Sequence, residues 1–147
     1  MTNDDIIGLV KNSVDALTKA TTALGDKATW SPLDKGRTAV NQVAECALIA
    51  GGVSGILHAK SAESLDMSGF GQAVAALATD AESVLATLAT NTESLYAAIA
   101  TLTEADYAIT VQMPWGATYT LAEVAMLVYW NNTYHEGQIN YIATLAE

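Results

Sequence analysis

Apolar residues recur at three- and four-residue steps along most of this chain. In the first segment the recurring positions are Ile6, Val10, Val14, Leu17, Thr21 and Leu24. An α-helix turns once in about 3.6 residues, so this spacing places those side chains on one face of a helix. The pattern predicts a helix over residues 3–25, which Gly25 ends.

Three further segments have helical patterns: residues 36–58, residues 72–103 and a last segment that begins near Thr120. The first of these is apolar on more than one face, which predicts deep burial. In the last, Thr120 is followed three residues later by Glu123, a capping box that marks a helix start. Together the segments predict an all-α fold, a four-helix bundle of antiparallel type, in one domain spanning residues 1–147.

The connections between these segments hold the residues that interrupt helices. Pro32 lies in residues 26–35, and Pro114 lies in residues 103–118, where the sequence TVQM predicts a short extended piece. Residues 59–71 contain Ser, Asp and Gly and are long enough to cross one end of a bundle. The pattern therefore predicts long helices joined by short and medium connections.

The charge balance argues against nucleic acid as a partner. The chain has 16 acidic and 6 basic residues, and no Lys or Arg follows Lys60. Binding to nucleic-acid phosphates or to an anionic membrane surface requires clustered Lys and Arg, and here they are dispersed. We therefore expect neither a nucleic-acid nor a membrane partner.

The sequence predicts a cytoplasmic location. The most apolar run, residues 43–57, is shorter than the roughly 20 residues that a membrane-spanning helix needs, and it carries Glu45. The first residues, MTNDDII, lack the basic stretch of a secretory signal. The single cysteine, Cys46, excludes an internal disulfide framework.

The last helical segment carries a polar interruption in its apolar stripe. The stripe positions are Leu121, Val124, Val128, Asn131, His135, Gln138, Ile142 and Leu145. Its middle, Asn131, His135 and Gln138, therefore points polar groups toward the bundle interior. Burying such groups without partners costs roughly 1–3 kcal/mol each, so we expect them to pair, to contact water or to bind a ligand.

Glu45 is the expected partner of these polar groups. It is the one carboxylate within the apolar part of residues 36–58, and a buried Glu almost always has a partner. If Glu45 faced His135 and Asn131, all three groups would be satisfied. Bundles build metal sites between facing helices in this way. A hydrogen-bonded core network and a functional pocket are equally open interpretations, and a metal site is less favoured than the pocket.

Two further residues are candidates for a pocket. Cys46 follows Glu45 and is either a thiolate ligand or a small buried apolar residue. Trp115 lies with Tyr119 just before the last helix, where the two rings either pack or line a pocket mouth. Gln138 completes the candidate pocket from the last helix.

Three stretches of the sequence resemble the DinB/YfiT-like proteins. WNNTYHEGQINYI, residues 130–142, resembles their last helix, which carries the pattern H-x-x-x-H-x-G-Q. TWSPLDKGRTAVNQVAECALI, residues 29–49, resembles their second helix, and MPWGATYTLAEV, residues 113–124, resembles their lead-in to the last helix. The resemblance implies a four-helix bundle with a crossover connection.

The resemblance also implies a site and an activity. The family typically holds a divalent metal, often nickel or zinc, with three His, and characterised members are thiol-dependent transferases or isomerases. Here His135 and Gln138 match the motif, Asn131 stands where the preceding His is expected, and Glu45 corresponds to the second-helix His. The implied metal ligands are therefore Glu45, Asn131 and His135.

Two functional hypotheses follow from the resemblance and from these residues. The first is a divalent-metal-dependent thiol transferase that joins a low-molecular-weight thiol, such as mycothiol or bacillithiol, to a small electrophile. The alternative is a metal-free family member that serves as a small-molecule-binding or structural bundle. The resemblance implies a homodimer in both cases.

Overall fold

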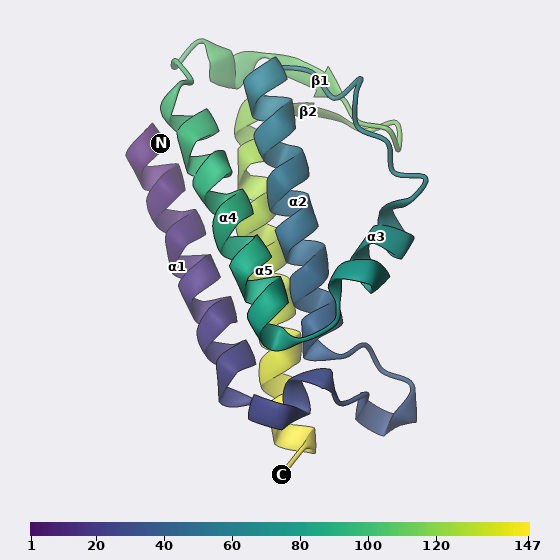
Figure 1. Ribbon diagram of the computed structural model, residues 1–147. Coiled ribbons are helices and arrows are strands. Elements are labelled where there is room, and N and C mark those ends of the chain that lie inside the picture. The colour runs from purple at the N-terminus through teal and green to yellow at the C-terminus, as the bar shows by residue number, and fades with distance from the viewer.

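The computed structural model describes the whole chain, residues 1–147, and shows four long helices packed side by side (Figure 1). These are α1 (Asn3–Ala23), α2 (Ala39–Ala59), α4 (Ala81–Ala100) and α5 (Leu121–Leu145). The connections hold a short helix, α3 (Phe70–Leu77), and the 3-10 helices η1 (Gly25–Thr29), η2 (Pro32–Asp34) and η3 (Asp106–Ala108). The four-helix bundle predicted from the sequence is confirmed.

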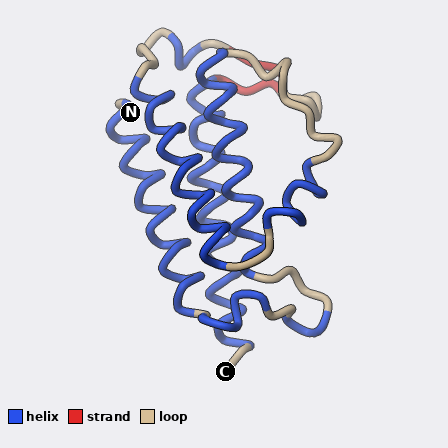
Figure 2. The backbone as a smooth tube through the Cα atoms, viewed as in Figure 1, coloured by secondary structure: helices blue, strands red, loops and turns tan.

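Helices α1 and α5 run in one direction, and α2 and α4 run in the opposite direction (Figure 1). Helix α2 packs against α4 and α5, and α1 packs against the same two helices. Because α2 and α4 are parallel neighbours, residues 60–80 cross the length of the bundle, with α3 inside this connection (Figure 2). The crossover connection is confirmed, whereas the antiparallel type is wrong for the α2–α4 pair.

Threonine caps fix where three of the long helices begin. The hydroxyls of Thr2, Thr38 and Thr120 each accept a hydrogen bond from the backbone N–H three residues further on. The capping box predicted at Thr120 and Glu123 is confirmed, and it starts the helix that carries the polar interruption. Thr38 starts α2 later than the predicted residue 36, because Gly36 belongs to the preceding turn.

The prediction of one helix over residues 72–103 is wrong. The chain leaves helical geometry between α3 and α4, where Asp80 is extended, with φ −151° and ψ 163°. Its carboxylate accepts a 2.8 Å hydrogen bond from the backbone N–H of Ser83, so it caps α4 instead of continuing α3. Asp favours such a cap over a helix interior because its short side chain competes for backbone N–H groups.

A β-hairpin covers one end of the bundle and leads into α5 (Figure 1). Strands β1 (Thr110–Gln112) and β2 (Thr118–Thr120) pair antiparallel, and the turn between them places Gly116 at φ +91°. The extended piece predicted at TVQM is confirmed, but its partner strand was not predicted. Because β2 ends at the N-cap of α5, the hairpin loop is held beside that helix.

The core consists of two apolar clusters with polar side chains near their boundary. One cluster includes Ile6, Val53, Leu95, Ile99 and Leu121, and the other includes Leu17, Val43, Val84, Leu88 and Ile139. Between their levels, the buried Asn132 side-chain amide donates a 3.1 Å hydrogen bond to Ser13 Oγ. Asn131 and His135 lie on the same stretch of α5, so the candidate site lies at mid-height in the bundle.

Helix α2 is long and apolar enough to cross a membrane by length and composition alone. However, 56% of its most apolar window is buried inside the bundle. Its contacts with both α4 and α5 account for this burial. A central position in the core therefore explains the hydropathy of α2.

Candidate functional site

His135 projects from α5 toward α2 and is 2% exposed. Its Nε2 lies 3.0 Å from Oε1 of Glu45, so the contact expected between these two residues is present. Glu45 itself is only partly buried, with 21% of its side chain exposed. The pair links the two helices at the centre of the polar interruption.

Two glutamines contact the other ring nitrogen of His135. Oε1 of Gln42 and Oε1 of Gln138 each lie 2.8 Å from Nδ1. Oxygen atoms of Gln42, Gln138 and Glu45 therefore surround both ring nitrogens of His135. Gln42 was not predicted, although it lies one turn before Glu45.

Arg37 completes this network from the segment before α2. Its Nη2 lies 2.7 Å from Oε2 of Glu45, and its Nε donates to Oδ1 of Asn41 at 2.7 Å. Burial alone would raise the pKa of Glu45, but the hydrogen bonds from His135 and Arg37 outweigh it and lower the pKa. Glu45 is therefore a carboxylate held between the His135 ring and the Arg37 guanidinium.

Asn131 does not join this network. Its amide nitrogen lies 3.4 Å from Sγ of Cys46, so the expected pairing of Asn131 with Glu45 is wrong. Cys46 is fully buried, and burial raises the pKa of its thiol far above the ordinary range. The thiol therefore stays neutral, and in this environment Cys46 is a small core residue with a weak hydrogen bond.

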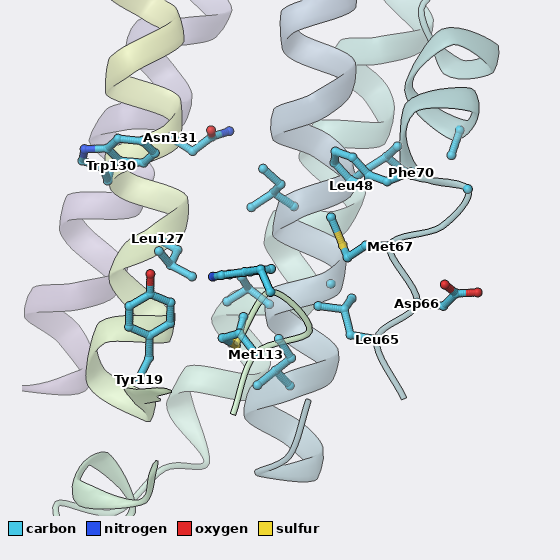
Figure 3. Close-up of a pocket in the computed structure, with 17 residues that line it drawn as sticks. Leu48, Leu65, Asp66, Met67, Phe70, Met113, Tyr119, Leu127, Trp130 and Asn131 are labelled. Carbon is cyan, nitrogen blue, oxygen red and sulfur yellow. The ribbon is translucent and has the colours of Figure 1, made fainter. Parts of the chain in front are cut away.

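An apolar pocket of about 450 Å³ adjoins Asn131 (Figure 3). It lies between α2, α5, the crossover segment and the hairpin loop, and 13 of its 17 lining residues are hydrophobic. Trp115 and Tyr119 line it, in the place predicted for a pocket mouth. Figure 3 shows Trp130 and Leu127 on the α5 side and Leu48 and Phe70 opposite.

The three predicted pocket residues lie in different places. Trp115 lines the apolar pocket and is 54% exposed. Gln138 is exposed and lines a separate open groove with Arg37 and Gln42. Cys46 lines neither cavity. The stripe prediction misplaced Gln138 because the buried face of α5 continues through Ile139 instead.

The donor atoms at Glu45 and His135 do not fit a divalent metal ion. Arg37 already binds the second oxygen of Glu45, and its positive charge opposes a cation there. Asn131 presents its amide nitrogen to Cys46, and an amide is a poor substitute for imidazole. Residues 1–147 contain no group of three His, Cys, Asp or Glu side chains placed to hold one ion. Zinc or nickel here stays a prediction from the family resemblance.

Comparison with known proteins confirms the fold. Two crystal structures of mycothiol-dependent maleylpyruvate isomerase match the chain with TM-scores of 0.79 and 0.75, at 12% and 11% sequence identity. The first is of a histidine-to-alanine mutant. Each match covers 95% of this chain and 61% of the matched chain, so this chain spans about three fifths of their length. Protein-family models and curated proteins gave no match to the sequence. The fold is the DinB-like helical bundle.

Proposed function

We propose that this protein binds a small, uncharged and mainly apolar molecule in the pocket beside Asn131. The observation that carries the proposal is the pocket itself, whose volume of about 450 Å³ lies within the range of small-molecule sites. Its only charged lining residue is Asp66, whose carboxylate points away from the cavity in Figure 3. An ionic ligand would therefore lose its hydration without gaining a partner.

Asn131 supplies the polar contact that orients the ligand. Its amide nitrogen contacts Cys46, which leaves the carboxamide oxygen without a hydrogen-bond partner in the protein. Since Asn131 is 5% exposed and lines the pocket, that oxygen is available to a ligand. A hydroxyl or N–H group on an otherwise apolar molecule would satisfy it.

The second candidate function is thiol transfer to a small electrophile. The names of the two structural neighbours suggest this activity, and the Glu45–His135 pair beside the pocket is the observation that favours it. We rank binding first because every ring nitrogen of His135 and both oxygens of Glu45 are already engaged within the protein. A residue so engaged holds its neighbours in place but has no free atom to activate a thiol.

Filling the pocket tests the binding proposal. Gly52 faces the cavity from α2, and a side chain there would first meet Leu65 at 3.5 Å, an ordinary contact. We expect Gly52→Leu to weaken binding of the neutral probe N-phenyl-1-naphthylamine by about tenfold or more, as a loss of roughly 1.4 kcal/mol would. Fluorescence titration measures this.

The matched control is Gly55→Leu, on the same helix. Gly55 is exposed, lines neither cavity and has open space where a Cβ would be. It should bind the probe as the wild type does. Equal binding by Gly52→Leu and Gly55→Leu, or no binding by the wild type, would contradict the proposal. For thiol transfer, conjugation of bacillithiol to a chlorodinitrobenzene electrophile that His135→Ala abolishes would reverse the ranking.

Homodimerisation and a cytoplasmic location stay predictions from the sequence. Sedimentation velocity of the purified chain measures the first, and fractionation of the producing cells measures the second. Neither is needed by the binding proposal, because the pocket is formed by one copy of the chain.

A further inference from the structure

A second cavity lies on the other side of His135 from the apolar pocket. It is an open groove of about 680 Å³ between the loop at residues 32–37 and the C-terminal half of α5. The two cavities share no lining residue. Gln42 and Gln138, which contact Nδ1 of His135, face the groove, so the polar network separates it from the pocket.

The groove concentrates positive charge in an acidic protein. Lys35 and Arg37 line it, and no Asp or Glu does, although the chain has 16 acidic residues against 6 basic ones. Arg37 shares its charge with Glu45, but Lys35 forms no ion pair. A local excess of positive charge on such a surface selects anions.

Two tyrosines give the groove aromatic walls. Tyr134 and Tyr141 lie one turn before and one turn after Gly137 on α5, and all three line the groove. Trp130 stacks on Tyr134, with ring centroids 5.7 Å apart and planes at 14°, which holds that ring in position. A Cβ at Gly137 would meet no atom within 4 Å, so the surface of α5 is open at this position.

The loop that carries Lys35 is tightly closed. The Gly36 N–H donates to the Pro32 carbonyl at 2.8 Å, and Ser31 Oγ donates to the Gly36 carbonyl at 2.8 Å. A Cβ at Gly36 would lie 2.6 Å from Cγ of Pro32, so only glycine allows this closure. The loop backbone next to Lys35 is thus set before any ligand arrives, which lowers the entropic cost of binding.

We propose that this groove binds a small aromatic carboxylate. The aromatic ring would lie over the bare backbone of Gly137 between Tyr134 and Tyr141, and the carboxylate would pair with Lys35. Arg37 offers a second, partly neutralised cation at the same wall. The residues of the groove can provide both ring stacking and a charge-assisted hydrogen bond. Neither the apolar pocket nor the polar network provides these two interactions together.

Titration with benzoate, followed by the backbone amide resonances of the full chain, tests the proposal. We expect saturable shifts at Gly36 and Gly137, and none with benzamide, which has the same shape without the charge. Lys35→Gln should weaken benzoate binding by about tenfold through loss of the ion pair. Gly137→Leu should abolish it by filling the open space over Gly137.

Gly55→Leu is the control for adding leucine to an exposed helical glycine, and it should bind benzoate as the wild type does. Gly137→Leu should also still bind N-phenyl-1-naphthylamine, which separates this proposal from the apolar pocket and shows that the variant is folded. Equal shifts with benzamide, or unchanged benzoate affinity in Lys35→Gln, would overturn the proposal. So would a dimer that Gly137→Leu dissociates without any benzoate binding, since the face would then join two copies.

Discussion

Glu45 lies between His135 and Arg37, and this placement makes its charge part of the folded structure. His135 contacts one carboxylate oxygen and Arg37 contacts the other. Removing the carboxylate charge weakens both contacts. The loss is largest on the side of His135, which is 2% exposed, whereas Arg37 is 46% exposed and its charge regains water.

We therefore expect Glu45→Gln to lower the free energy of unfolding at pH 7 by about 1–3 kcal/mol. The folded state lowers the pKa of Glu45 below its ordinary 4.5. Its stabilisation is therefore present above that value and is lost as the pH falls through the lowered folded pKa. Urea unfolding from pH 7 down to pH 3 should show a shallower acid loss in Glu45→Gln than in the wild type.

Glu136→Gln is the matched control for this carboxylate. Glu136 follows His135 but only accepts a hydrogen bond from Asn140 on the same helix. It should change stability little at any pH. If Glu45→Gln and Glu136→Gln gave the same pH profile, the charge of Glu45 would not stabilise the fold.

The contact between Glu45 and His135 was predictable because a carboxylate in an apolar helix requires a partner. Gln138 was wrongly predicted to be the buried residue in place of Ile139, because both positions continue a three- and four-residue stripe from His135. Asn132 was also missed, because its burial beside Ser13 depends on the packing of α1 against α5. Arg37 was missed because it precedes α2, and Gln42 was missed although it lies one turn before Glu45 on the same helix.

The cap of α5 was predictable from the sequence, whereas the missed cap at Asp80 produced the largest error. The apolar stripe of residues 72–103 keeps its phase across the break, from Val74 and Leu77 to Ala81 and Val84. Periodicity therefore could not reveal that the helix stops. The signal that could have done so is Asp80 with Ser83 three residues later, a capping pattern inside an apolar run.

The cap of α5 matters most for the site, because it fixes where this helix begins. Thr120 Oγ1 accepts from the Glu123 N–H at 3.2 Å, and the Thr120 N–H donates to the Glu123 carboxylate at 2.7 Å. We expect Thr120→Ala to lower the free energy of unfolding by about 1 kcal/mol, the usual cost of losing an N-cap hydroxyl. Chemical denaturation measures the loss.

A second threonine on the same helix provides the comparison. Thr144 is exposed near the end of α5, and its hydroxyl only makes a 3.4 Å contact with the Asn140 carbonyl. Thr144→Ala should be neutral or slightly stabilising, since Ala has the higher helix propensity. A loss at Thr144→Ala as large as that at Thr120→Ala would show that the cap has no special effect.

At the scale of the whole molecule, the apolar periodicity predicted the bundle but not the directions of its helices, which only the crossover connection implied by the family resemblance indicated. Four periodic segments of about twenty residues leave few compact arrangements other than a bundle. Helix direction, however, depends on how far each connection travels, and residues 60–80 return the chain to the end where α2 began. This crossover places α2 between α4 and α5, which explains why α2 is apolar on more than one face.

The position of α2 also bears on whether the polar network can bind a metal ion. Glu45 and His135 come from α2 and α5, as facing helices supply ligands in many bundles, but Arg37 enters from the segment before α2 and takes one carboxylate oxygen. We expect the untagged protein to carry no stoichiometric zinc or nickel by inductively coupled plasma mass spectrometry, even after incubation with each ion. A chelator should leave its melting temperature unchanged, since only a ligand that binds the folded state stabilises it.

The variant Arg37→Ala tests why the site should bind no metal, because it removes the guanidinium that opposes a cation at Glu45. If that variant gained zinc affinity while the wild type had none, Arg37 would be the residue that keeps metal out of a site whose other donors still face each other. If the wild type held one equivalent of metal that His135→Ala released, the donor set would be a working metal centre, and the transferase would replace ligand binding as the leading function.

His135→Ala has a stability readout as well, because it leaves Glu45 with only Arg37 as a partner. If the polar groups form only a hydrogen-bonded network, His135→Ala should lose stability without any change in metal content.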